Sequence, residues 1–238
     1  MNDISKNEGY LLCCFGKEIY FNLTLRAIEN IRVYDTERPI CIITDNAIFF
    51  EELNIENIIV KLFDYNNHLF PKIDYNIDWN KYGLIPKVFQ SYYSPFNVTM
   101  YLDVDMFFKS NFTHFFDLFY ESNQPILIPG LSDENNKSPS NWHWGHINEI
   151  MDSINLNIPQ TFTTVILYNH SILPIIKESM FFILSNLDIW GVRAWYCAGY
   201  PDEIIYSILL GMNNYKISEE IHSWILNNEF CDPVNKTI

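Results

Sequence analysis

Two carboxylates stand almost side by side at the end of an apolar run. In the stretch YLDVDMFF, Asp103 and Asp105 are surrounded by large apolar residues of the kind that form buried strands. Burying one unpaired carboxylate is costly, and two neighbouring carboxylates repel each other. A positive group is therefore expected close to the pair. If the whole stretch is a strand, side chains two residues apart point to the same side, so both carboxylates can share one ligand.

Three interpretations of the pair are open. The first is a polar strand end that caps a turn. The second is a phosphohydrolase of the haloacid dehalogenase type, whose motif resembles D-x-D-x-[TV], but Phe107 stands where that motif has a threonine or valine. The third is a divalent metal site that holds a nucleotide diphosphate, because carboxylate oxygens suit Mg²⁺ or Mn²⁺. We favour the third.

The segments before the pair predict an α/β fold with a parallel sheet. Apolar runs that end in turn residues alternate with stretches of helical periodicity. Strands are expected at 9–16, 40–45, 57–63 and 98–108, and helices at 17–34, 49–54 and 86–94. Ligands of such sheets bind outside the carboxyl ends of the strands. This places Asp103 and Asp105 at the mouth of the site.

Composition limits the kinds of ligand. The 238 residues are expected to form one domain, 1–238, with a nucleotide-binding half at 9–110 and an acceptor-binding half at 111–238. The formal charge of −14 argues against a nucleic-acid partner. An anionic ligand must then be held by a few local cations or a metal. The chain has no apolar run long enough to span a membrane and no signal-like start, so we expect a cytoplasmic protein.

The stretch YLDVDMFF, after a strand–helix–strand–helix–strand half, resembles the DXD motif of GT-A glycosyltransferases. In particular it resembles family 8, which includes glycogenin and the bacterial lipooligosaccharide galactosyltransferases. The resemblance implies a GT-A fold, in which a Rossmann-like, mostly parallel sheet is flanked by helices and carries an acceptor-side extension. It also implies metal-dependent transfer of a sugar from a UDP-sugar to a carbohydrate or protein acceptor, with retention. Asp103 and Asp105 would hold Mn²⁺ or Mg²⁺, and Val104 would belong to the donor site.

Two further stretches match the family in order. CCFGKEIYFNLTLRAI resembles its first strand, loop and helix, which implies that Tyr20 lies against the uracil. Cys14, Phe15 and Gly16 would then offer backbone contacts to the nucleotide. Tyr20 can equally be an ordinary aromatic residue on a helix face. Lys87, in the helix before the Asp103 strand, would neutralise phosphate charge on the sugar donor, and the alternative is a solvated lysine.

A third match lies near the C-terminus. CAGYPDEIIYSILLG resembles the segment in which Asp-Gln or Asp-Glu opens a helix, so Asp202 would face the donor sugar or the reaction centre, with Glu203 as its neighbour. Acidic residues are also what any helix N-terminus prefers. The polar segment 130–150 is the acceptor-side candidate, because indole faces suit sugar rings. A local core is the alternative for its residues Trp142, His143, Trp144 and His146.

The sequence departs from the family at two places. Phe162, Thr163 and Thr164 stand where the family has Asn-Ser-Gly after a phenylalanine, which puts hydrogen bonding to the donor sugar in question. The third metal ligand of the family is a histidine near the C-terminus, and His222 is the candidate here without the neighbouring glycine and lysine. These departures keep open a non-catalytic protein of the same fold that binds nucleotides or carbohydrates.

Overall fold

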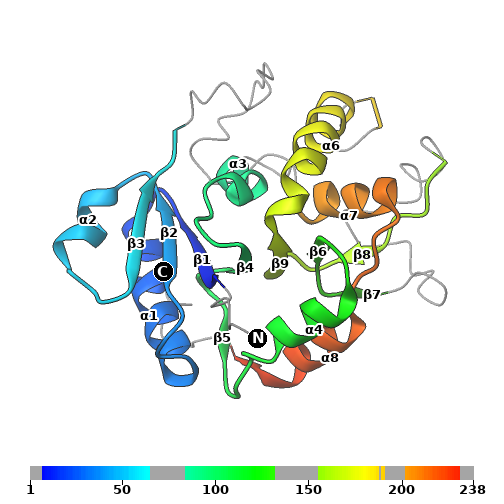
Figure 1. The fold of residues 1–238 in the computed structure, drawn as a ribbon. Helices are drawn as coiled ribbons and strands as arrows, with labels where there is room; N and C mark the ends of the chain where they lie inside the picture. Colours follow the sequence, from blue (N-terminus) through cyan, green and yellow to red (C-terminus); the bar gives the residue numbers. More distant parts are fainter. Residues whose placement is uncertain (1–6, 65–83, 132–154, 188, 191–201, 231–238) are drawn as a thin grey trace, which may run out of the picture.

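The computed structural model describes residues 7–64, 84–131, 155–187, 189–190 and 202–230 (Figure 1). The strands are β1 Glu8–Cys14, β2 Ile40–Thr44, β3 Ile58–Leu62, β4 Val98–Leu102, β5 Phe107–Phe108, β6 Ile126–Leu127, β7 Gly130–Leu131, β8 Gln160–Thr161, β9 Val165–Asn169 and β10 Glu229–Phe230. The helices are α1 Glu18–Tyr34, α2 Ala47–Glu52, α3 Leu84–Val88, α4 Phe115–Ser122, α6 Leu173–Asn186, α7 Asp202–Asn213 and α8 Glu219–Asn228, with short 3₁₀ turns at Gln90–Tyr92 and His170–Ile172.

The central sheet is mostly parallel, which confirms the predicted fold class. Its order is β3-β2-β1-β4-β9-β6. Strands β3, β2, β1 and β4 run parallel to one another, and β9 is antiparallel to both β4 and β6. Leu12 of β1 is in register with Ile42 of β2 and with Leu102 of β4, so these three strands end at the same edge. Strands from both predicted halves of the chain therefore share one sheet.

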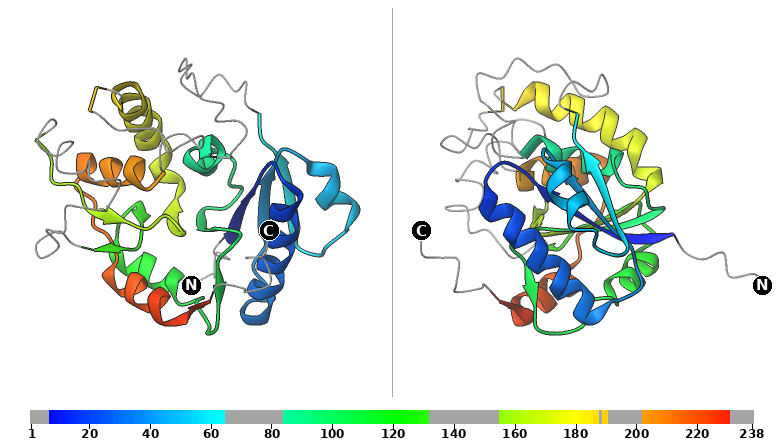
Figure 2. Two further views of the ribbon diagram at one scale, coloured as in Figure 1. Left: turned by 180° about the vertical axis from the view of Figure 1, so that it is seen from behind. Right: turned by 90° about the vertical axis from the view of Figure 1, so that its left-hand side faces the viewer.

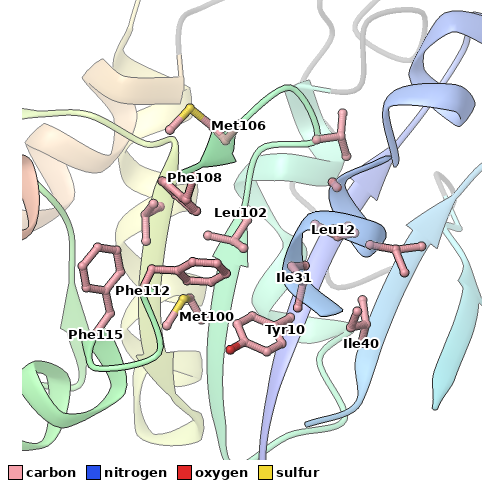
Figure 3. Packing of buried hydrophobic residues seen from close by; sticks show 14 of the residues in the cluster. Tyr10, Leu12, Ile31, Ile40, Met100, Leu102, Met106, Phe108, Phe112 and Phe115 are labelled. Atoms are coloured by element: carbon pink, nitrogen blue, oxygen red, sulfur yellow. The ribbon is translucent and has the colours of Figure 1, made fainter. Parts of the chain in front are cut away.

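Helices cover both faces of the sheet, as the two views in Figure 2 show. Side chains alternate along each strand, so successive residues enter different layers. Met100 and Leu102 of β4 pack into the cluster with α1, α4 and α8, where Figure 3 shows them beside Tyr10 and Phe112. Tyr101 instead packs into the cluster with α3, α6 and α7. Burial on both faces explains why the strands read as continuous apolar runs.

The predicted strand 98–108 is wrong in its second half. Strand β4 ends at Leu102, and the chain then turns, with the Met106 N–H bonded to the carbonyl oxygen of Asp103 at 3.1 Å. Strand β5 pairs with β10 in a separate two-stranded sheet. The cause is packing, since Phe107 and Phe108 are buried in the cluster with α1, α4 and α8. The alternation of a continuous strand therefore cannot place Asp103 and Asp105 on one side.

The predicted helix 86–94 is interrupted. Helix α3 ends at Val88, and a 3₁₀ turn over Gln90–Tyr92 follows it. The carbonyls of Lys87 and Val88 accept hydrogen bonds from the Tyr206 hydroxyl, which takes the place of the later N–H groups of a longer helix. In the part of the chain that is described, no helix is long and apolar enough to cross a membrane.

Candidate active site

The carboxyl edge of the sheet gathers the predicted site. Asp103 follows β4, Asp45 follows β2, and the loop that begins at Phe15 follows β1. These three strands are neighbours in the sheet, so their ends lie at one edge. Helices α3 and α7, which pack on each other beside this edge, bring Lys87 and Asp202. Five segments of the chain thus converge at this edge, as the parallel topology predicts.

Lys87 joins two carboxylates of this edge. Its Nζ lies 3.0 Å from each carboxylate oxygen of Asp103 and 2.7 Å from Oδ2 of Asp202. The Tyr101 hydroxyl also donates a hydrogen bond to Oδ1 of Asp103. The positive group that we expected close to Asp103 is therefore Lys87. Its charge is shared with protein carboxylates.

Asp202 is held by a second group as well. Its Oδ2 accepts a hydrogen bond of 2.5 Å from the Thr163 hydroxyl, in addition to the ion pair with Lys87. Thr163 is fully buried, so its hydroxyl is directed at the carboxylate and is shielded from solvent. Asp202 is the first residue of α7, where the free N–H groups of a helix favour a negative charge. Asp202 is itself buried, so both of these contacts lie in the interior of the protein.

Burial and charge act on this group together. Burial opposes the charged form of Lys87, but the carboxylates of Asp103 and Asp202 outweigh it and raise the pKa of Lys87. Burial raises the pKa of Asp103, and the neighbouring carboxylates of Asp202 and Asp105 add to that rise, against the lowering by Lys87. The lysine therefore stays protonated at neutral pH. The carboxylates around it compete for its charge.

Glu203 is a site residue that sequence reasoning had treated only as a neighbour of Asp202. Burial raises its pKa to about 7, and the adjacent Asp202 carboxylate contributes to the rise. Glu203 therefore exchanges its proton near neutral pH, unlike an ordinary glutamate. The sequence signal for a raised pKa was the adjacent acidic pair Asp202 and Glu203 at a helix start, in a chain that has a second acidic pair in its candidate site.

Asp105 is exposed, and in the described part of the chain its carboxylate makes no hydrogen bond or ion pair. An accessible carboxylate next to Asp103 suits a hard cation such as Mn²⁺ or Mg²⁺. Among the described residues, no group of three His, Cys, Asp or Glu side chains could hold a metal ion. The assignment of Asp103 and Asp105 as metal ligands therefore stays a prediction. Val104 between them is buried, and its side chain packs in the core.

His222, the predicted third ligand, lies on α8. It is only 7% exposed, and its ring stacks on Phe162 with 4.3 Å between ring centroids and 15° between planes. Burial lowers its pKa, so the ring is neutral at pH 7. A neutral imidazole can bind a metal, but His222 belongs to no three-residue metal group in the described residues. Its role as a ligand stays a prediction.

The loop after β1 holds the predicted nucleotide contacts. Cys14 and Phe15 are buried, so only their main chain can face a ligand. Gly16 has a φ of 83°, which favours glycine, and its N–H donates to Oδ2 of Asp45 at 3.0 Å. Tyr20 of α1 is 43% exposed, and its ring is accessible to a base. The Gly16 N–H is thus already paired. These nucleotide contacts stay predictions.

The acceptor-side candidates of 130–150 are Trp142, His143, Trp144 and His146, and they lie outside the described residues.

Solved glycosyltransferase structures share this fold. Mouse xyloside xylosyltransferase 1, in its apo form, matches with a TM-score of 0.54 and 11% identity over 89% of this chain and 84% of that one. The glycosyltransferase GlyE of Streptococcus pneumoniae TIGR4 matches with 0.54 and 11% over 90% of this chain and 46% of that chain. The mannosyltransferase Ktr4p from S. cerevisiae, in complex with GDP, matches with 0.54 and 11% over 90% and 70%. No protein-family model and no curated protein sequence matches.

The chain therefore has the α/β fold of GT-A glycosyltransferases, which confirms the fold predicted from the sequence. Identities of 11% show the fold alone. Function has to be argued from the side chains at the carboxyl edge.

Proposed function

We propose that this protein is a metal-dependent glycosyltransferase that takes a sugar from a nucleotide-sugar donor, of the UDP type, and passes it to a carbohydrate or protein acceptor. Family 8 membership and retention of the anomeric configuration are part of this proposal, and both rest on the resemblance of YLDVDMFF to that family. The fold is that of GT-A glycosyltransferases. The proposal joins that fold to the chemistry of its carboxyl edge.

One observation carries the proposal. Lys87 ties Asp103, at the end of the central strand, to Asp202, at the start of α7. This fixes two carboxylates at the edge where α/β sheets bind their ligands and leaves Asp105 exposed beside them. A mere turn cap would need no half-buried lysine between carboxylates from two distant segments.

The side chains divide the work as follows. Asp105, with Asp103, is the pair that would hold Mn²⁺ or Mg²⁺. When bound, the cation would supply positive charge to the diphosphate as the nucleotide departs. Lys87 holds Asp103 and Asp202 in fixed positions. The carboxylate of Asp202, which Lys87 and Thr163 hold in place, is the protein group that we place against the donor sugar. Tyr20 is proposed to lie against the base.

Two other functions are kept as outcomes of the test. A non-catalytic protein of this fold would bind the nucleotide without turnover, and the replacement of Asn-Ser-Gly by Phe162, Thr163 and Thr164 favours it. A phosphohydrolase would need an aspartyl nucleophile. The sequence speaks against it, because Phe107 stands where the D-x-D-x-[TV] motif of that class has a threonine or valine.

The test compares wild type with Asp105→Asn and with a matched control, Asp117→Asn, which removes an exposed carboxylate from the first turn of α4. Melting temperature is measured with UDP, GDP or inorganic phosphate, each with and without Mn²⁺. A ligand at a hundred times its Kd stabilises the folded state by about 2.7 kcal/mol. A rise of several degrees is expected with UDP and Mn²⁺ together, in wild type and in the control only.

Release of UDP from a panel of UDP-sugars then separates enzyme from binder. Stabilisation by UDP without release from any donor would favour the non-catalytic function. Stabilisation by GDP alone would change the donor class. If neither nucleotide raises the melting temperature in the presence of Mn²⁺, the glycosyltransferase proposal is wrong, and hydrolysis of a simple phosphomonoester becomes the next assay.

A further inference from the structure

Helix α7 holds Lys87 at two points. Asp202, its first residue, contacts the ammonium group, and Tyr206, one turn later, donates to the main-chain carbonyl of the same lysine. Residues four apart lie on one face of a helix, so both groups face α3. The side chain and the main chain of Lys87 are thus fixed by one rigid element.

Tyr206 is buried in the core, and its hydroxyl faces the end of α3. Its ring is 1% exposed, and its hydroxyl lies 3.2 Å from the carbonyl oxygens of both Lys87 and Val88. Both carbonyls belong to the last turn of α3, a helix of five residues. The last-turn carbonyls of a helix have no N–H partner within that helix. In the described part of the chain, Tyr206 is the side chain that bonds them, and it acts as a cap for α3.

The length of α3 makes this cap matter. A helix of five residues is far below the length at which a helix is stable alone, so its position depends on tertiary contacts. The four-carbon side chain of lysine has several rotatable bonds. A shift of its main chain would change how its ammonium group meets Asp103 and Asp202 together.

We infer that Tyr206 is a positioning residue, which fixes the main chain of Lys87 so that its ammonium group holds Asp103 and Asp202 at the same time. The importance of this role for catalysis rests on the proposed function. The positioning itself does not, because it concerns an ion pair that is present in the free protein.

The first experiment measures the coupling between Lys87 and Asp202. Unfolding free energies are determined in urea for wild type, Lys87→Met, Asp202→Asn and the double variant, and the cycle is repeated in a Tyr206→Phe background. We expect the coupling energy to fall by more than half in that background. If Lys87→Met does not yield folded protein, Lys87→Gln, which keeps a polar terminus, replaces it.

Tyr92→Phe is the matched control. The Tyr92 hydroxyl also donates to a main-chain carbonyl, that of Leu173, at 3.1 Å, but it makes no bond to Lys87. Both variants lose one buried or half-buried phenol hydroxyl, so both are expected to lower the melting temperature. Only Tyr206→Phe should weaken the coupling. An equal coupling energy between Lys87 and Asp202 in the wild-type and Tyr206→Phe backgrounds would overturn the inference. A tyrosine that only stabilises the fold would leave that coupling energy unchanged.

The second experiment measures UDP release. Tyr206→Phe is expected to lower kcat roughly tenfold with KM changed less than twofold, since misplaced groups cost rate more than affinity. In a Lys87→Met background the same substitution should have no further effect on kcat. Full kcat in Tyr206→Phe, with an active wild type, would contradict the inference. If wild type releases no UDP, the proposed function fails, and the coupling experiment alone decides the role of Tyr206.

Discussion

Replacing Glu203 by glutamine should remove a specific pH dependence of stability. The folded protein raises the pKa of this carboxyl from its ordinary value of 4.5 to about 7, mainly through burial. The folded state therefore holds the proton more tightly than the unfolded state. Stability linked to Glu203 is fully present below pH 4.5, declines as the pH rises through 7, and is absent above that.

The magnitude follows from the size of the shift. Each pKa unit corresponds to about 1.4 kcal/mol, so the rise from 4.5 to about 7 amounts to about 3.5 kcal/mol in total. About 2 kcal/mol of this is lost between pH 5.5 and pH 8.5. That window stays clear of the acidic isoelectric point expected from a formal charge of −14.

The assay is urea unfolding of wild type and Glu203→Gln at several pH values in this window, with a chelator present to exclude metal binding. The difference between the two unfolding free energies cancels all other titrating groups that the substitution leaves unchanged. Glu220→Gln is the control, because Glu220 is exposed and occupies the same second position in its own helix, α8. The expected difference changes by about 2 kcal/mol for Glu203→Gln and by less than about 0.5 kcal/mol for the control.

A constant difference between wild type and Glu203→Gln from pH 5.5 to pH 8.5 would refute the reasoning. It would mean that Glu203 is hydrated well enough to titrate as an ordinary glutamate. A difference that grows with pH in the opposite direction would place a cation, and not a carboxylate, as its dominant neighbour.

Two further predictions concern the core. Arg38→Met should lower the unfolding free energy by about 3 kcal/mol in urea titrations, because it strands the buried carboxylates of Glu8 and Asp35, which lie 2.7 and 2.6 Å from the guanidinium. A loss below about 1 kcal/mol would show that these carboxylates are hydrated. Gly9→Ala would bring a Cβ to 2.4 Å from the Phe96 ring, so a loss of about 1–3 kcal/mol is expected in thermal melts. Combining it with Phe96→Leu should recover part of that loss.

The sequence predicted the first half of the fold well, for a physical reason. Strands buried on both faces are short and uniformly apolar, and the helices between them carry a helical period. Both patterns are local, so helix α1 was predicted over 17–34 and observed as Glu18–Tyr34. The end of β4 was mispredicted because Phe107 and Phe108 do not continue that strand. They are apolar because they pack in the cluster with α1, α4 and α8. Composition alone cannot tell which layer an aromatic residue enters.

The candidate site was predictable in its members more than in its contacts. Asp103, Lys87 and Asp202 were all expected at the carboxyl edge, and they meet there. The partners of Lys87 were not foreseen, because the lysine was expected to face a phosphate. Thr163 was considered only as a replacement for the serine of the family's Asn-Ser-Gly, whereas its hydroxyl donates a hydrogen bond to Asp202. Such pairings depend on tertiary distances that no spacing in the sequence encodes.

The charge balance of the site bears on how it can hold a diphosphate. Lys87 is the one cation in the described group, and its charge is offset by Asp103 and Asp202. Asp105 and, above pH 7, Glu203 add further negative charge. A diphosphate would be repelled by this set as it stands. The proposed function therefore requires positive charge at this edge beyond that of Lys87, and the divalent cation that we propose would supply it.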